Sequence, residues 1–266
     1  MPIEPSSPRV TLVVPAHDEE ESLPHLADEI AAALDALPYE LVLVDDGSTD
    51  GTLDVMLDLA AADPAVRVLR QWPNRGQSAA FRAGWRAARA PVVVTLDADL
   101  QNDPADVPRL LRKLEEGWDV VNGVRRDRRD GFVRRVSSRI ANSVRNRLTG
   151  DSVTDVGCTL RACRTELLRD LPMFDGMHRF LPTLLRFRGA RVTEIPVGHR
   201  PRRFGSSKYG IRNRLWKGIV DLWAVRWMKR RWIDDGGVEE LHPGHPRPDR
   251  PREGATAPVG AGDAER

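Results

Sequence analysis

Two carboxylates one residue apart, Asp97 and Asp99, are the residues in this chain best placed for chemistry. They follow residues 91–96, an apolar run typical of a buried strand in a parallel sheet. Ligands bind at the carboxyl edge of such a sheet, and Gln101 would lie there too. These hard oxygen donors suit Mg²⁺ or Mn²⁺, so all three residues are candidate metal ligands. The alternative is a polar loop that only follows a strand, because so short a motif is common.

Strands and helices are expected to alternate around this motif. Runs of β-branched and leucine residues predict strands at 10–14, 40–44, 66–70, 91–96, 119–123 and 191–197. Helical spacing predicts helices from the acids at 18–21 to about residue 36, and at 52–62, 77–88, 104–116 and 177–188. The alternation is typical of an α/β fold with a Rossmann-like, mostly parallel sheet covered by helices. Acids follow three of the first four strands, so we expect carboxylates to converge on one sheet edge.

The chain lacks the glycine-rich motifs of two large classes of nucleotide-binding protein. No G-x-G-x-x-G follows the first expected strand, and no G-x-x-x-x-G-K-[ST] occurs in the sequence. A dinucleotide-dependent dehydrogenase and a P-loop NTPase are therefore disfavoured. What remains is a nucleotide site that uses acids and a metal in place of a glycine cradle.

Positive charge gathers in two stretches, although the net charge is only +2, from 41 Lys and Arg against 39 Asp and Glu. Residues 125–147 contain nine Arg against two Asp, and residues 200–232 contain eleven Arg and Lys against one Asp. Such stretches predict an anionic partner, which could be phosphate, a lipid headgroup or nucleic acid. A solvated surface is the alternative for either stretch alone.

The first basic stretch includes a predicted helix at 128–148. This helix would carry Arg134, Ser138 and Asn142 on one face, because they are four residues apart. Arg125 would reach the carboxyl edge of the sheet at the end of the preceding strand. A basic surface helix is the alternative. The second stretch opens with a basic loop that contains Arg202, Arg203, Gly205, Ser206, Ser207 and Lys208.

Residues 211–232 predict a helix with one apolar stripe, formed by Trp216, Val220, Trp223 and Trp227. Arg and Lys surround the stripe, a composition typical of a helix that lies in a membrane interface. Packing of the stripe on the protein's own core is the alternative. The expected organisation is a flexible N-terminus at 1–8, a catalytic domain at 9–210, an amphipathic membrane-interface helix at 211–233 and a disordered tail at 234–266.

The two cysteines, Cys158 and Cys163, lack partners at zinc-like spacing and fit free thiols in a reducing cytoplasm. Residues 1–8 lack the features of a signal peptide, and no segment holds about 18 uninterrupted apolar residues. We therefore expect a cytoplasmic protein that is peripherally associated with the inner face of the membrane.

Several short motifs follow one another along the chain. They are Val13-Val14-Pro15 with Glu19-Glu20, Val44-Asp45-Asp46-Gly47-Ser48-Thr49-Asp50-Gly51, Asp97-Ala98-Asp99-Leu100-Gln101, Asn122-Gly123 with Arg125, Ser138-Arg139 with Asn142, Asp155 to Cys158, His178-Arg179-Phe180, and Gly205 with Ser207-Lys208-Tyr209. In this order the chain resembles the family 2 glycosyltransferases of the GT-A fold, over about residues 9–232. Within that family it is similar to the polyprenyl-phosphate sugar synthases, which include dolichyl-phosphate mannose synthase.

The resemblance implies a role for individual positions. The nucleotide pocket would be lined by Pro15, His17, Glu19, Val44, Asp46, Asp97 and Ala98. Asp99 and Gln101 would hold the metal on the donor's diphosphate, and Arg202 and Lys208 would close over its phosphates. The acceptor's phosphate would meet Arg125, Arg134 and Ser138. His17-Asp18 stands where the family often has an aromatic residue and then Asn, which leaves the choice between a GDP- and a UDP-linked donor open.

The implied reaction is inverting, metal-dependent transfer of a sugar from a nucleotide sugar to a polyprenyl phosphate of the undecaprenyl or dolichyl type. A family 2 enzyme with a soluble or cell-envelope saccharide acceptor is one alternative, although the basic residues and the tryptophan helix have less reason to exist there. A nucleic-acid-binding module would explain the arginines and not the carboxylates at strand ends, so no nucleic-acid partner is expected. The role of Asp155, the sugar and the oligomeric state stay open.

Overall fold

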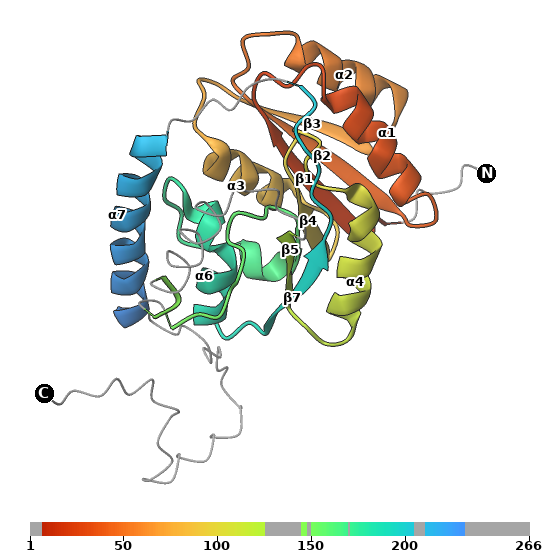
Figure 1. Ribbon diagram of the computed structural model, residues 1–266. Helices are drawn as coiled ribbons and strands as arrows, with labels where there is room; N and C mark the ends of the chain where they lie inside the picture. The colour runs from red at the N-terminus through yellow and green to blue at the C-terminus, as the bar shows by residue number, and fades with distance from the viewer. Residues whose placement is uncertain (1–6, 126–144, 148–149, 170, 205–210, 232–266) are drawn as a thin grey trace, which may run out of the picture. The chain divides into compact units, whose positions relative to one another are not determined.

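The computed structural model of the chain describes residues 7–125, 145–147, 150–169, 171–204 and 211–231, with backbone only at 211–217 and 219 (Figure 1). The described residues belong to one compact unit, Met1–Trp232, and residues 233–266 lie outside the described residues. The tail expected at 234–266 therefore stays a prediction, as do the other domain boundaries.

Seven strands form one sheet in the order β3-β2-β1-β4-β6-β5-β7. The strands β1, β2, β3 and β4 pair in parallel, as do β5 and β7, so their carboxyl ends meet at one edge. The predicted α/β fold and mostly parallel sheet are confirmed. The bounds are β1 Val10–Ala16, β2 Tyr39–Asp46, β3 Val66–Gln71, β4 Val92–Thr95, β5 Val120–Arg125, β6 Arg161–Arg164 and β7 Val192–Val197.

Strand β6, which has four residues and runs antiparallel to both β4 and β5, was not predicted from the sequence. The expectation that β4 lies in a parallel part of the sheet therefore holds only on its β1 side, because its other neighbour, β6, is antiparallel. The strand was hard to find because its sequence is Arg-Ala-Cys-Arg, with little of the β-branched composition that marks a strand. Its neighbours in the sheet, and not its own propensity, hold it in place.

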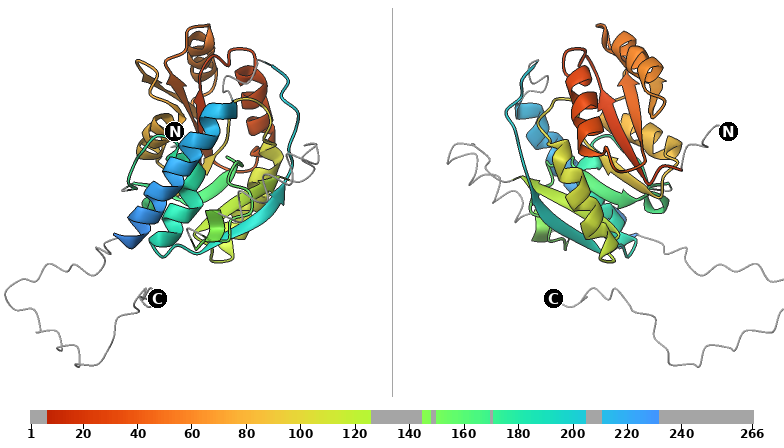
Figure 2. Two further views of the ribbon diagram at one scale, coloured as in Figure 1. Left: turned by 60° about the vertical axis from the view of Figure 1, so that its left-hand side comes forward. Right: turned by 90° about the vertical axis from the view of Figure 1, so that its right-hand side faces the viewer.

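Helices cover both faces of the sheet, and two hydrophobic clusters lie between the layers (Figure 2). Helices α1, α2 and α4 pack on one face, and α3, α6 and α7 supply buried residues to the other. Alternate residues of β1 serve the two faces, since Leu12 and Val14 belong to one cluster and Val13 to the other. The bounds are α1 Leu23–Ala33, α2 Thr52–Ala62, α3 Gln77–Ala87, α4 Val107–Glu115, α6 Leu181–Phe187 and α7 Ile211–Arg230, with 3₁₀ turns at Pro104–Asp106, Thr165–Leu168 and Met177–Phe180.

The start of α1 differs from its prediction. The acids at 18–21 were expected in the first turn of this helix, but α1 begins at Leu23 and its first turn holds no acidic residue. Asp18 and Glu20 instead tie two loops together: Asp18 accepts from the backbone of Thr49 at 2.7 Å and Glu20 from that of Gly51 at 2.7 Å. These carboxylates brace the edge of the sheet between β1 and β2.

Helix α7 is apolar on two sides. Val225 is fully buried against the core, and Leu222 and Met228 pack beside it. The other side carries Trp223 and Trp227, each 63% exposed, so this part of the predicted stripe faces away from the core. Figure 2 shows α7 beside α6, where Lys229 lies 5.6 Å from the centre of the Phe187 ring. No helix in the described ranges combines the length and apolarity needed to cross a bilayer.

His178 is held between α3 and β6 as a neutral side chain. Its Nδ1 lies 2.8 Å from the hydroxyl of Ser78, and its carbonyl accepts a hydrogen bond from Arg161. Burial, and then the charges of Arg161 and Arg179, lower the pKa of His178 to about 3. Below about pH 6.5 the His178 imidazole takes up a proton in the unfolded chain but stays neutral in the folded protein. The free energy of unfolding therefore falls as the pH drops from about 6.5 toward 3.

Replacing His178 should remove this loss of stability in acid. Between pH 7 and pH 5 the wild-type protein should lose about 2 kcal/mol more than His178→Gln in free energy of unfolding, because only the wild type has an imidazole that titrates on unfolding. Urea unfolding of both proteins at the two pH values measures the difference. Equal losses would show that His178 takes up its proton in the folded state.

Candidate active site

The loop after β4 carries Asp97 and Asp99 to the carboxyl edge of the sheet. Both oxygens of Asp97 accept hydrogen bonds, from the Gln77 side chain at 2.7 Å and from the Thr159 hydroxyl at 2.7 Å. Asp99 is 7% exposed, and its Oδ1 accepts from the backbone of Gln101 at 3.2 Å. The two carboxylates are therefore oriented before any ligand arrives.

The backbone turns sharply between Asp99 and Gln101. Leu100 has φ of +60°, a left-handed conformation that costs a non-glycine residue about 1 kcal/mol or more. Its side chain is 1% exposed and packs in the hydrophobic core, which holds the turn in place. The turn brings Gln101 beside the segment after β7, where the backbone of Arg200 donates to the Gln101 carbonyl at 2.9 Å.

The proximity of two carboxylates changes their chemistry. Burial, and then the charge of Asp99, raise the pKa of Asp97 to about 6. The hydrogen bond from Thr159 and the positive charges of Arg161 and Arg125 act in the opposite direction. A bound cation would reduce the repulsion between the two carboxylates.

Arg161 lies behind the site with its side chain almost fully buried, at 2% exposed. It donates to the Asn122 side chain at 2.8 Å and to the carbonyls of Val156, Cys158 and His178. Burial lowers the pKa of this guanidinium, while the surrounding charges, Asp97 and Asp155 among them, act to raise it. Arg161 and Thr159 were not predicted as site residues, because they lie in or just before the unpredicted strand β6. The only signal in the sequence was that Arg161 interrupts a run of small and apolar residues.

Arg125, at the end of β5, is bound in two places by Asp155. Its Nε and Nη2 each lie 2.8 Å from a carboxylate oxygen, and its backbone N–H also donates to Asp155. Burial opposes the charge of Arg125, but the hydrogen bonds and charge of Asp155 outweigh it and raise the pKa of Arg125. Gly157 permits this approach, since a Cβ there would lie 2.7 Å from Arg125 Nη2.

Arg202 reaches the site from the segment after β7. Its Nη2 donates to Asp99 Oδ2 at 2.7 Å, and its Nη1 lies 3.6 Å from a carboxylate oxygen of Glu19. The segment is fixed on both sides. Arg200 pairs with Glu29 at 2.6 Å and Asp103 at 2.8 Å, and the ring of Phe204 stacks on His25 with centroids 5.7 Å apart.

The residues expected around the nucleotide differ in how far they reach the surface. Asp46 is 4% exposed; burial raises its pKa, although the backbone of Arg75 donates to it at 2.8 Å. Val44 is fully buried in the core under α3, and Ala98 is 3% exposed. Pro15 is likewise buried, and His17 is half-buried beside Asp18, with 3.5 Å between their side chains. Their roles in nucleotide binding stay predictions.

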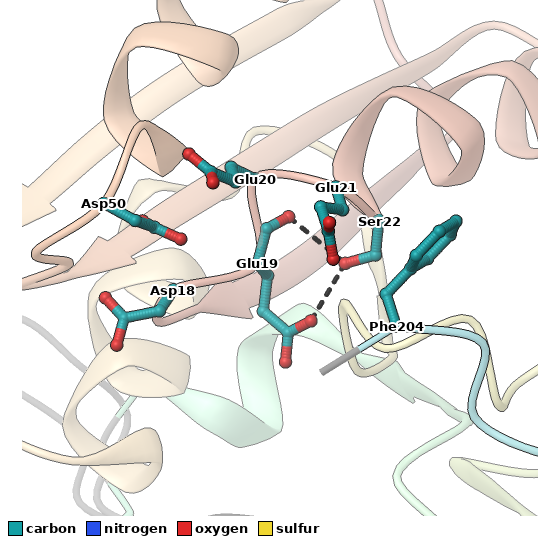
Figure 3. Close-up of a pocket in the computed structure, with 7 residues that line it drawn as sticks. All are labelled: Asp18, Glu19, Glu20, Glu21, Ser22, Asp50 and Phe204. Carbon is teal, nitrogen blue, oxygen red and sulfur yellow. Dashed lines mark hydrogen bonds between the residues drawn. The ribbon is translucent and has the colours of Figure 1, made fainter. Parts of the chain in front are cut away.

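An acidic pocket adjoins the site, and it is lined by the loop that precedes α1, by Asp50 and by Phe204 of the segment after β7. Figure 3 shows its lining side chains and the hydrogen bonds from the Ser22 hydroxyl to the carbonyl and the carboxylate of Glu19, at 3.2 and 2.9 Å. A diphosphate would be repelled by so many carboxylates. The lining residues are Asp18, Glu19, Glu20, Glu21, Ser22, Asp50 and Phe204.

Three expected site residues, Arg134, Ser138 and Lys208, lie outside the described residues, so their roles stay predictions. Cys158 and Cys163 are buried free thiols, as expected. Burial raises the pKa of Cys158 to about 11 and that of Cys163 to about 12, so neither is a reactive thiolate.

The donor set around Asp99 fits a divalent metal that is shared with a substrate. Asp97 and Asp99 are hard oxygen ligands, and the guanidinium of Arg202 marks Asp99 Oδ2 as a position that already accepts a cation. No cluster of three His, Cys, Asp or Glu side chains suited to a metal occurs in the part of the chain that the structure describes. Mg²⁺ is typically held by one or two carboxylates together with substrate phosphates, so the residues present are sufficient.

The fold is similar to that of solved sugar transferases. Glucosyl-3-phosphoglycerate synthase from Mycobacterium tuberculosis, crystallised with Mn²⁺, uridine diphosphate and phosphoglyceric acid, superimposes with a TM-score of 0.64 at 24% identity, over 87% of this chain and 81% of that one. Mannosyl-3-phosphoglycerate synthase from Rubrobacter xylanophilus superimposes with a TM-score of 0.66 at 19% identity, over 88% of this chain and 77% of that one. These neighbours establish a GT-A-like fold.

Relatives with higher identity carry a more specific name. Undecaprenyl-phosphate 4-deoxy-4-formamido-L-arabinose transferase from Serratia proteamaculans is 44% identical over 207 residues, and that from Edwardsiella ictaluri is 41% identical over 206 residues. Each match covers 76% of this chain and 63% of the relative, so the chain spans less than two thirds of their length. Residues 11–172 match the family described as glycosyl transferase family 2, and with this match and these relatives the chain belongs to that family.

Proposed function

We propose that the chain transfers a sugar from a nucleoside-diphosphate donor to a polyprenyl phosphate of the undecaprenyl type, with inversion and with Mg²⁺ or Mn²⁺. The observation that carries this proposal is the 44% identity to a transferase named for undecaprenyl phosphate. Two features of the site support it. A carboxylate pair suited to a metal and an arginine held by Asp155 both lie at the carboxyl edge of the sheet, as donor and acceptor phosphates would require.

The donor side is built on Asp97, Asp99 and Arg202. Asp99, Gln101 and Asp97 would hold the metal. When bound, the metal would neutralise charge on the departing nucleoside diphosphate. Arg202 would donate to the same diphosphate, since its guanidinium lies 2.7 Å from Asp99. Gln77 and Thr159 keep the Asp97 carboxylate oriented, so little reorganisation is needed when the donor binds.

The acceptor side is built on Arg125. Within the described residues its hydrogen bonds use Nε and Nη2, which leaves Nη1 for an acceptor phosphate. A phosphate monoester has a second pKa of about 6, so the attacking oxygen is already anionic at neutral pH and needs no strong base. Asp155 binds Arg125 through both of its oxygens, which favours a positioning role for Asp155 over proton abstraction.

Helix α7 supplies a surface for the membrane that holds such a lipid. Val220, Trp223 and Trp227 are between 50% and 63% exposed, and basic residues flank them. Exposed tryptophans with Arg and Lys are typical of helices at the headgroup level of a bilayer. We therefore propose that the protein binds the membrane peripherally through this side of α7, at its cytoplasmic face.

The activity can be tested directly on the full chain. UDP- and GDP-linked sugars, including 4-deoxy-4-formamido-L-arabinose, are incubated with undecaprenyl phosphate and Mg²⁺ or Mn²⁺, and lipid-linked product is measured by mass spectrometry. Asp99→Asn should remain folded by circular dichroism yet lose more than about a hundredfold in rate, because metal stabilisation contributes several kcal/mol. Product formed only with a soluble saccharide or with 3-phosphoglycerate would contradict the lipid acceptor. Near-normal transfer by Asp99→Asn would contradict the metal site.

The proposed role of Asp155 predicts an effect on one substrate only. Asp155→Asn should lower kcat/KM for undecaprenyl phosphate by about 10–100-fold, since a misplaced Arg125 no longer orients the attacking oxygen, and leave the donor KM within about twofold. Asp119→Asn is the matched control, because Asp119 also pairs with arginines, Arg164 and Arg191, which are not site residues. Equal losses for donor and acceptor would contradict the positioning role.

If α7 binds the membrane, its exposed tryptophans should contribute to the affinity of the protein for lipid vesicles. The double variant Trp223→Ser with Trp227→Ser should sediment with anionic liposomes roughly tenfold more weakly, since about 1.4 kcal/mol changes a binding constant tenfold. Trp72→Ser is the control, because Trp72 is also 63% exposed but stands at the end of β3, where Arg70 lies over its ring. Unchanged sedimentation of the double variant would exclude this surface.

A further inference from the structure

We propose that Arg202 is an internal counter-ion that holds the metal-binding carboxylate of Asp99 until the donor arrives, so that this one side chain couples metal binding to nucleotide binding. The inference rests on the proposed function, because it takes Asp99 to be the metal ligand. It goes further by assigning Arg202 a role in the protein without substrate. The guanidinium would then have two partners in turn, first the carboxylate and later the diphosphate.

The contacts of Arg202 support the first of these states. Its Nη2 lies 2.7 Å from Asp99 Oδ2, while Nη1 lies 3.6 Å from Glu19, so one guanidinium spans two carboxylates from different loops. The Asp99 side chain is 8% exposed and that of Arg202 is 30% exposed. A contact with a carboxylate this well shielded is screened less by solvent than a surface ion pair.

The backbone around Arg202 is anchored, so a change of partner requires only its side chain to move. The backbone of Arg200 donates to the Gln101 carbonyl at 2.9 Å, and its side chain pairs with Glu29 and Asp103. Phe204 stacks on His25 with 3° between the ring planes. A flexible side chain on a fixed backbone can turn from the carboxylate to a phosphate nearby without rearrangement of the fold.

Competition for one oxygen gives the coupling its direction. A metal ion binds a carboxylate oxygen at about 2.0–2.1 Å, and a second cation at 2.7 Å on the same oxygen would repel it. A metal that took this oxygen without a diphosphate would displace Arg202 and leave it only the more distant carboxylate of Glu19, 3.6 Å away. When a diphosphate binds together with the metal, Arg202 gains a new anionic partner and the cost disappears. Each ligand should thus strengthen the binding of the other by the same factor.

Binding of Mn²⁺ alone to the full chain tests this inference, with free Mn²⁺ followed by electron paramagnetic resonance. Arg202→Met removes the competing charge at nearly constant length, and we expect it to bind Mn²⁺ roughly tenfold more tightly than wild type, within the range usual for coupled sites. Arg191→Met is the control for the loss of one positive charge, because Arg191 pairs with Asp119 and both residues precede strands β7 and β5, at the opposite edge of the sheet from Asp99. It should change Mn²⁺ affinity less than twofold.

Adding UDP or GDP, whichever binds more tightly, gives the second half of the test. In wild type the nucleotide should raise Mn²⁺ affinity, and in Arg202→Met this increase should shrink several-fold, since no arginine is left to change partner. If Arg202→Met binds Mn²⁺ no more tightly than wild type, while Asp99→Asn still abolishes that binding, the counter-ion role is wrong and the metal site stands. If Mn²⁺ binding is indifferent to Asp99→Asn in both backgrounds, the metal site of the proposed function fails as well.

Discussion

Repulsion between the carboxylates of Asp97 and Asp99 is the constraint around which this sheet edge is organised. The two groups stand one residue apart in a buried loop, and their proximity helps to raise the pKa of Asp97 to about 6. Keeping such a pair costs stability unless cations or hydrogen-bond donors offset it. The protein supplies both, with Gln77 and Thr159 on one carboxylate and Arg202 on the other.

Three arginines near the two carboxylates offset this negative charge, and they differ in how deeply they are buried. Arg161 is buried behind the loop and bound to carbonyls, so its position does not depend on ligands. Arg125 is held by Asp155 through both Nε and Nη2. Arg202 is the most exposed of the three and the one with a side chain able to change partner. Positive charge near the carboxylates thus ranges from a buried guanidinium, Arg161, to a partly exposed one, Arg202.

Helix α7 shows how one element can serve the core and the surface together. Val225 anchors it, Asp221 pairs with Arg179 at 2.7 Å, and the tryptophans project from the opposite side. The predicted stripe is exposed at Val220, Trp223 and Trp227, so its packing on the core is wrong for these residues. Leu222, Val225 and Met228, which are not part of the stripe, pack on the core instead. The exposed stripe and the carboxylate site belong to the same compact unit, Met1–Trp232.

The sequence by itself determined six of the seven strands, their alternation with helices, the convergence of carboxylates and the family, because hydrophobic periodicity and short polar motifs are local signals. It could not reveal β6, whose four residues become a strand only through pairing with β4 and β5. The partners of the site residues could not be predicted for the same reason. Arg125 and its partner Asp155 are 30 residues apart in the sequence, and Asp99 and its partner Arg202 are 103 residues apart. Only the tertiary structure decides such pairs, since burial and distance, and not spacing along the chain, determine which charges meet.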